Sequence, residues 1–337
     1  MKTCLRGLRS SFVCRVLISS VVFLFLLALR TSCQASAGPL EAPVHEADAS
    51  PLAALSHPLR TSVNMVLLPV RVFDPEERLV TGLKASAFEV FEDKKQREIE
   101  YFSTEDSPLS VTLLLDLSGS MANKFDIERE AISQFYANAN ARDEYSVITF
   151  ADNPHVIAHS IQSLDEIEAS LDGEKPHGNT SLIDAVWSGA DLMRTAEYER
   201  RYLLLITDGG DNYSRHSMRQ LVRKLEESDV EVYAIGIFDA GAFKTVEEAM
   251  GRRWLQRITD ATGGRTLAVK KDADVAAAAA NVSREMRQEY VLGWRPSTLR
   301  TDPEHRRIRV TVMPQRGSAP LRAYYKTGYS VDAVSTP

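Results

Sequence analysis

The feature that most constrains this chain is a regular alternation of short apolar runs and longer amphipathic stretches through its middle. The apolar runs have the length of β-strands and span residues 111–115, 145–150, 202–207, 232–237 and 265–269. The intervening stretches have helical character and span residues 125–139, 181–195, 215–227 and 246–262. Strands that are apolar throughout belong to sheets covered on both faces, and helical connections make consecutive strands parallel. The sequence therefore predicts an α/β fold, a doubly wound and mainly parallel sheet with a crevice at the carboxyl ends of its strands.

Both flanks of this region have strand character. The strand-type runs lie at residues 66–72, 88–91 and 99–102 before it, and at 290–294, 305–313 and 321–325 after it. A last helix is expected ahead of the second group, because Asp272 can cap it and apolar residues recur at 275, 279, 282 and 286. We infer that strands from the two ends of the chain combine into one small accessory β domain beside the central sheet.

These patterns divide the chain into successive segments. We predict a signal peptide at 1–37, a flexible linker at 38–62, N-terminal strands of the accessory domain at 63–108, the central domain at 109–288 and C-terminal strands of the accessory domain at 289–330. The linker is assigned no regular structure, because it is rich in Ala, Pro and Ser and has no sustained periodicity.

The N-terminus has the layout of an export signal. Residues 1–15 carry four basic residues and no acidic one, residues 16–29 are largely apolar, and Ala35-Ser36-Ala37 has the small-x-small pattern of a cleavage site. The apolar run is short for a membrane span of about 20 residues. We therefore predict a secreted or periplasmic protein, with an uncleaved N-terminal membrane anchor as the alternative.

Charge and cysteine usage exclude several functions. The first 37 residues hold five of the 40 basic residues and none of the 46 acidic ones, so their removal leaves a net charge of −11. Such a chain is a poor binder of nucleic acid. Cys4, Cys14 and Cys33 all lie in the segment that is removed, so the mature protein is expected to have neither disulfides nor thiolate chemistry.

A group of oxygen-bearing side chains follows the first apolar run of the central region. Asp116, Ser118 and Ser120 are spaced two residues apart, and Gly119 between the serines is expected to free the backbone for the turn that brings them together. One carboxylate and two hydroxyls make a hard-oxygen set of the kind that Mg²⁺ prefers. The sequence therefore predicts a divalent-cation site at this strand end.

Two further loops are expected at the same edge of the sheet. Residues 178–181 offer Thr180 before a helix, and residues 207–211 offer Asp208 after a strand. Asp211 is an alternative ligand from the same loop, but Asp208 is preferred because it directly follows the apolar strand.

The order of these three motifs resembles the metal-ion-dependent adhesion site of the von Willebrand factor A (VWA) family. The motifs are D-x-S-x-S at Asp116, a threonine before a helix at Thr180, and a strand-terminal T-D-G at Asp208. The resemblance implies the fold of that family and a bound Mg²⁺ or Mn²⁺. It also implies that Ser118 and Ser120 bind the metal directly, that Thr180 binds directly or through water, and that both aspartates act largely through water.

The same resemblance implies a partner and a cellular location. In the family, an Asp or Glu of a protein partner completes the coordination of the metal. Over residues 65–330 the chain is similar to a bacterial secreted subfamily, through motifs that include residues 88–93, 261–265 and 326–329. One departure concerns the threonine loop, which reads Gly-Asn-Thr where the family often has two glycines. In some members the last helix slides when the metal site is occupied, which leaves a switch open as an alternative.

The sequence is compatible with three functions. The first is a non-enzymatic, exported adhesion or scaffold module that captures an acidic residue of a protein. The second is a structural envelope or assembly component, in which the metal only stabilises the loops. The third is a phosphohydrolase with Asp116 as nucleophile, but such enzymes usually carry a second carboxylate two residues on, where this chain has Ser118, and no other catalytic motif is present.

Overall fold

The computed structural model describes residues 65–238, 246–296, 304–313 and 319–331. The predicted signal peptide at 1–37 and linker at 38–62 lie outside the described residues. Among the helices that are described, none is both long and apolar enough to cross a membrane.

The central element is a six-stranded sheet with the strand order β10-β9-β8-β5-β6-β7. Five neighbouring strands run parallel, and the sixth, β7, is an antiparallel edge strand. The strands are β5 (Ser110–Asp116), β6 (Glu144–Phe150), β7 (Pro154–Ile161), β8 (Arg201–Thr207), β9 (Val230–Ile237) and β10 (Thr266–Val269). The predicted doubly wound, mainly parallel sheet is therefore confirmed.

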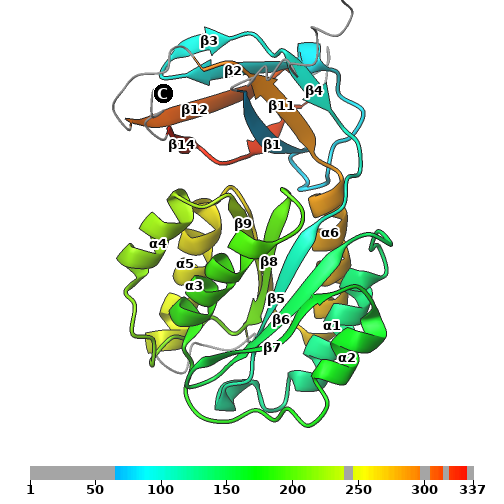
Figure 1. Cartoon of the computed structure of the whole chain (residues 1–337), viewed down its shortest axis with the longest axis vertical. Helices are drawn as coiled ribbons and strands as arrows, with labels where there is room; N and C mark the ends of the chain where they lie inside the picture. The colour runs from blue at the N-terminus through cyan, green and yellow to red at the C-terminus, as the bar shows by residue number, and fades with distance from the viewer. Residues whose placement is uncertain (1–64, 239–245, 297–303, 314–318, 332–337) are drawn as a thin grey trace, which may run out of the picture. The chain divides into compact units, whose positions relative to one another are not determined.

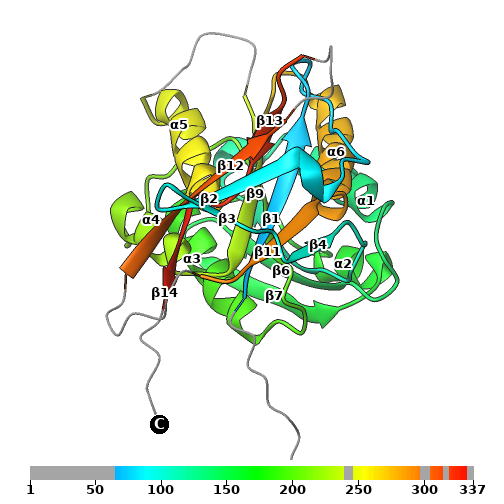
Figure 2. The ribbon, with the colours of Figure 1, turned by 90° about the horizontal axis from the view of Figure 1, so that it is seen from above.

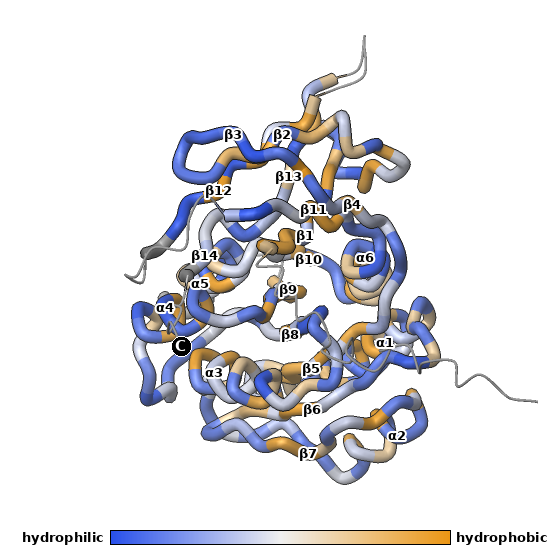
Figure 3. The backbone as a smooth tube through the Cα atoms, turned by 45° about the horizontal axis from the view of Figure 1, so that its top comes forward, coloured by the Kyte–Doolittle hydropathy of each residue, from blue (hydrophilic) through white to orange (hydrophobic). Residues whose placement is uncertain are grey.

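Helices cover both faces of this sheet (Figure 1). One face packs against α1 (Phe125–Tyr136), α2 (Leu164–Ser170) and α6 (Val275–Arg287). The other packs against α3 (Leu182–Leu192), α4 (Met218–Glu226) and α5 (Val246–Asp260). Alternate residues of β5 enter the two cores, since Leu113 and Leu115 lie in the first and Leu114 in the second. Burial on both faces explains why the central strands are mostly apolar, as the orange colouring of β5 in Figure 3 also shows.

The flanking strands form two four-stranded antiparallel sheets that share a third apolar core. The first has the order β13-β1-β11-β4 and the second β14-β12-β2-β3. Their strands are β1 (Val66–Phe73), β2 (Phe88–Glu92), β3 (Lys95–Arg97), β4 (Tyr101–Ser103), β11 (Tyr290–Trp294), β12 (Glu304–Val312), β13 (Arg322–Tyr324) and β14 (Gly328–Val331). Each sheet combines strands from both ends of the chain, as Figure 2 shows for β1 beside β11 and β2 beside β12. The accessory β domain expected from both ends is thus present, with two sheets.

Several details differ from the prediction. Asp272 does not cap the last helix: a 3-10 turn covers Asp272–Asp274, and α6 begins at Val275 with Asp274 at its N-cap and no side-chain cap bond. The short strands β3 and β14 and the helix α2 were not predicted as separate elements. The signal for α2 was available, because Ser163 and Glu166 form a capping box in which each side chain accepts a hydrogen bond from the other residue's backbone amide.

A buried ion network joins β1 to the central sheet. The Arg71 guanidinium is fully buried and donates hydrogen bonds to the carboxylates of Glu231, at the start of β9, and Glu289, just after α6. Arg200 also donates to Glu289, at 2.9 Å, and to the carbonyl of Met286 near the end of α6. The accessory strands are therefore tied to the edge of the central sheet at which its parallel strands begin.

Candidate metal centre

Asp116 is the last residue of β5, in the middle of the central sheet, and its side chain is fully buried. Its Oδ1 accepts a hydrogen bond from the Ser118 amide at 2.9 Å, and its Oδ2 accepts one from the Thr207 hydroxyl at 2.5 Å. Thr207 ends the neighbouring parallel strand β8, so the two residues meet at the carboxyl edge. Both carboxylate oxygens of Asp116 are thus held by hydrogen bonds within the protein.

The two serines of the first loop lie side by side. Ser118 is buried, Ser120 is exposed, and their hydroxyl oxygens are 3.1 Å apart. Two oxygens at adjacent corners of an octahedron around Mg²⁺, each about 2.1 Å from the ion, lie about 3 Å apart. The observed separation therefore fits simultaneous coordination of one small cation.

The three predicted loops are bonded to one another through their backbones. The Gly119 amide donates to the carbonyl of Gly178, and the His177 amide donates to that of Leu117 at 2.7 Å. The amides of Asn212 and Tyr213 both donate to the carbonyl of Thr180, at 3.0 and 3.1 Å. In return the Thr180 amide donates to the Asn212 side-chain oxygen at 3.0 Å. The structure thus brings the loops of Asp116, Thr180 and Asp208 together at one edge.

The structure explains why the threonine loop has Asn179 where the family often has a second glycine. Asn179, which stands where a second glycine is common, donates from its amide and its side chain to Asp152 Oδ1, both at 2.8 Å. Gly178 has φ +68°, and a Cβ there would lie 2.8 Å from the Asp152 carboxylate. Gly178 is therefore required, whereas Asn179 is held by a partner of its own.

Gly119 does not have the role expected of it. Its φ is not positive, and a Cβ there would meet only the Gly178 carbonyl, at an ordinary contact distance of 3.4 Å. The turn after Ser118 is a 3-10 turn, Gly119–Met121, which any residue can adopt.

The electrostatics of the site favour a cation. Burial, and then the negative charge of Asp208, raise the pKa of Asp116 to about 7. Asp211, the alternative ligand, instead accepts a hydrogen bond from the Ser214 hydroxyl at 2.6 Å, which supports the choice of Asp208. No three His, Cys, Asp or Glu side chains of the described residues converge to hold an ion. A metal here would therefore depend on hydroxyl ligands and on water, as Mg²⁺ sites commonly do.

Sequence reasoning missed the residues that hold the predicted ligands and their loops in place. Thr207, Asp152 and Asn212 fix Asp116, Asn179 and Thr180 by side-chain hydrogen bonds. Thr207 could have been found, because it ends a strand beside Asp116. Asp152 and Asn212 had no such signal, since they bond to loops 27 and 32 residues away in the chain.

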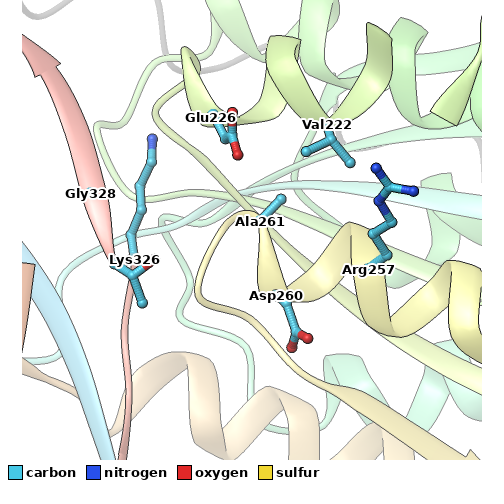
Figure 4. A pocket seen from close by; sticks show the side chains of 8 residues that line it. Val222, Glu226, Arg257, Asp260, Ala261, Lys326 and Gly328 are labelled. Atoms are coloured by element: carbon cyan, nitrogen blue, oxygen red, sulfur yellow. The ribbon is translucent and has the colours of Figure 1, made fainter. Parts of the chain in front are cut away.

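A separate pocket of about 260 Å³ lies at the other edge of the sheet, between the ends of α4 and α5 and the start of β14 (Figure 4). Glu226, Arg257, Asp260 and Lys326 are among its lining residues. The Lys326 ammonium donates to the Ser228 carbonyl at 2.6 Å, and burial lowers its pKa. None of the predicted metal ligands lines this pocket.

Comparisons with solved structures place the chain beside VWA-type proteins at low identity. A von Willebrand factor type A protein from Catenulispora acidiphila is 13% identical, with 80% of this chain and 72% of that chain covered and a TM-score of 0.46. An aerotolerance-related membrane protein from Bacteroides fragilis is 18% identical, with coverages of 53% and 98% and a TM-score of 0.43. Proximal thread matrix protein 1 from the mussel byssus, with a zinc-occupied MIDAS motif, is 16% identical, with coverages of 58% and 49% and a TM-score of 0.45.

No curated protein matches the chain. The family model of the von Willebrand factor type A domain matches residues 110–281, which is just over half of the 337 residues. This range begins with β5, contains all three loops of the candidate site and ends within α6. Domains of this type are commonly metal-dependent interaction modules and are generally not enzymes. The chain belongs to the von Willebrand factor type A domain family.

Proposed function

We propose that this protein is an exported binding module that holds Mg²⁺ or Mn²⁺ and captures an Asp or Glu side chain of a protein partner. The observation that carries the proposal is the pair of serine hydroxyls 3.1 Å apart beside the buried Asp116, bonded through the backbone to the loop of Thr180. The metal site would consist of Asp116, Ser118, Ser120, Thr180 and Asp208.

The hydrogen bonds support a division of roles among these residues. Both oxygens of Asp116 are already used by Ser118 and Thr207, which favours action through water and a contribution of charge. The exposed Ser120 faces solvent, so a ligand can approach the metal from that side. Two carboxylates balance a divalent cation formally, and a coordination position open to solvent can still gain from a hard anionic ligand.

The same geometry disfavours the phosphohydrolase alternative. A nucleophilic carboxylate must reach the phosphorus atom of its substrate, but Asp116 is fully buried and hydrogen-bonded through both oxygens. Ser118 also occupies the sequence position where a second catalytic carboxylate would stand.

The first test is a calorimetric titration of the purified protein with Mg²⁺ and Mn²⁺. Wild type is expected to bind one ion saturably and Asp116→Ala to bind none. Asp211→Ala is a matched control from the Asp208 loop and is expected to bind like wild type. Absence of binding in wild type, or equal binding in Asp116→Ala, would contradict the proposed site.

A second measurement separates a partner-binding metal from a structural one. Acetate is the smallest model of an acidic side chain, and Mn²⁺ strongly broadens the NMR signals of a ligand that coordinates it. Broadening of acetate but not acetamide by the Mn²⁺-loaded protein, lost in Asp116→Ala, would support carboxylate capture. Metal binding without acetate broadening would favour the structural envelope component instead.

Export is part of the proposal and is supported by the basic and apolar N-terminus with its small-x-small motif. The expected mature protein begins at Gly38. Intact mass measurement of protein expressed in a bacterium with its native N-terminus would show this cleavage, and retention of residues 1–37 in the membrane fraction would favour the anchor.

A further inference from the structure

Helix α5 carries a glycine in its interior that the proposed function does not use. Gly251 is the sixth of the fifteen residues of α5 (Val246–Asp260), and it is buried. Glycine destabilises the interior of a helix relative to alanine, because it loses more conformational freedom on folding. A buried glycine at this place is therefore expected only where another part of the chain comes too close for a Cβ.

The part of the chain that comes this close is the Asp208 loop. A Cβ on Gly251 would lie 2.7 Å from the carbonyl oxygen of Gly209, 2.8 Å from its carbonyl carbon and 3.1 Å from the carbonyl oxygen of Asp208. In the reverse direction, a Cβ on Gly209 would lie 2.9 Å from the carbonyl carbon of Gly251. The helix and the loop thus meet backbone against backbone, and no side chain lies between them that could rotate away.

Gly209 takes part in the hydrogen bonds that hold both aspartates of the candidate metal centre. Its amide donates to Thr207 Oγ1 at 2.9 Å, and the same hydroxyl donates to Asp116 Oδ2. The amide of the next residue, Gly210, donates to Asp208 Oδ1 at 3.3 Å. A displacement of Gly209 would therefore reach the two carboxylates that are proposed to supply the charge of the metal site.

The size of such a displacement decides whether it matters. To move from 2.7 Å to an ordinary contact distance of 3.4 Å from a new Cβ, the Gly209 carbonyl oxygen must shift by about 0.7 Å. Binding sites require their side chains to be held to within about 0.5 Å. The helix has little freedom to move instead, because Leu255 and Ile258 fix α5 in the apolar core of the central sheet. The Asp208 loop would therefore give way.

We propose that Gly251 is a positioning residue of the candidate metal centre: its missing side chain lets α5 close on the Asp208 loop and sets where the Asp208 carboxylate lies. The inference rests on the proposed metal site. The coupling is reciprocal, because an effect of helix packing on metal affinity requires an equal effect of the metal on helix packing. Metal binding should thus hold α5 more firmly against the loop.

The first test compares Mn²⁺ binding to wild type and Gly251→Ala by calorimetry. The Kd is expected to rise about 10- to 100-fold, the usual effect of disturbing the groups that orient metal ligands. An unchanged Kd would show that the helix gives way instead of the loop, and would overturn the inference even if the melting temperature fell.

The matched control is Gly189→Ala in α3, another buried glycine inside a helix. The nearest atoms to a Cβ there are side-chain atoms of Leu203 and Leu114, at 3.1–3.3 Å, which can shift without moving any backbone. This variant should keep the wild-type Kd, whatever its melting temperature. A Kd raised equally in both variants would mean that any strain in a helix on this face weakens the metal site, and would also contradict the role of Gly251.

A second measurement needs no variant and stays decisive if Gly251→Ala does not fold. In wild type, Mn²⁺ should slow amide hydrogen exchange in residues 251–260 of α5 several-fold more than in α2, which packs on the opposite face of the sheet. Equal slowing in the two helices would mean that the reciprocal coupling is absent. If wild type binds metal and Asp116→Ala does not, failure of either test leaves the proposed function intact, whereas no binding in wild type would remove both.

Discussion

At the scale of single residues, the loops of the candidate site are held by residues that have little conformational freedom themselves. Gly178 illustrates this, because its left-handed backbone and its approach to Asp152 leave no room for a Cβ. Through the neighbouring Asn179, the same Asp152 sets the path of the chain into Thr180. A change at Gly178 should therefore act on the proposed metal ligands as well as on stability.

We expect Gly178→Ala to lower the free energy of unfolding by about 1–3 kcal/mol through backbone strain and to weaken Mn²⁺ binding. Gly173→Ala is the control, because Gly173 also has positive φ, +89°, but no atom lies within 4 Å of a Cβ placed there. It should lose similar stability and keep its metal affinity. Calorimetry and urea unfolding measure the two effects, and equal metal affinities in both variants would contradict the assignment of Gly178.

Asp116 gives a pH dependence at the same scale. Its folded, metal-free pKa of about 7 lies above the unfolded value of about 3.9, so the folded state binds the proton more tightly. This contribution to stability is complete below about pH 4 and is lost as pH rises through 7, to an extent on the order of 4 kcal/mol. The melting temperature in EDTA should therefore fall between pH 5 and pH 8.

Saturating Mn²⁺ should abolish this fall, because the metal replaces the proton, and metal binding below pH 7 should release protons. Burial also raises the pKa of Glu231, so the fall in the melting temperature of wild type is not due to Asp116 alone. The part of the fall in melting temperature that disappears in Asp116→Asn is due to Asp116. If the melting temperature of Asp116→Asn fell with pH as steeply as that of wild type, the raised pKa assigned to Asp116 would be contradicted.

At the scale of elements, the candidate metal centre lies where β5 ends and the chain turns towards α1. The loop between them is only eight residues long and holds Ser118 and Ser120, so three of the five proposed ligands belong to one local segment. The apolar face of α1 packs on the sheet beside α6.

At the scale of the whole molecule, Arg71 joins the accessory strands to the central sheet through Glu231 and Glu289. Removing one partner of a buried ion pair leaves the others uncompensated, which usually costs about 3–5 kcal/mol. We expect Arg71→Met to lower the free energy of unfolding by this amount in urea titrations.

The control for Arg71 is Arg78→Met, because Arg78 pairs with Asp74 and Glu76 on the surface and its side chain is 73% exposed. It should change stability by less than about 1 kcal/mol. Similar losses in the two variants would show that the buried network does not hold the accessory strands to the central sheet.

The sequence by itself determined the alternation of strands and helices, the doubly wound sheet and the grouping of three oxygen-rich loops at one edge. These features depend on local hydrophobic period and on residues that follow strand ends, which can be seen along the chain. Only the tertiary structure decided that Asp152 and Asn212 hold the loops, that Arg71 meets Glu231, and that Glu128 is buried. Most of these contacts join residues far apart in the chain, and the burial of Glu128 depends on the elements packed over α1. A local pattern cannot specify them, because they depend on how the completed elements pack.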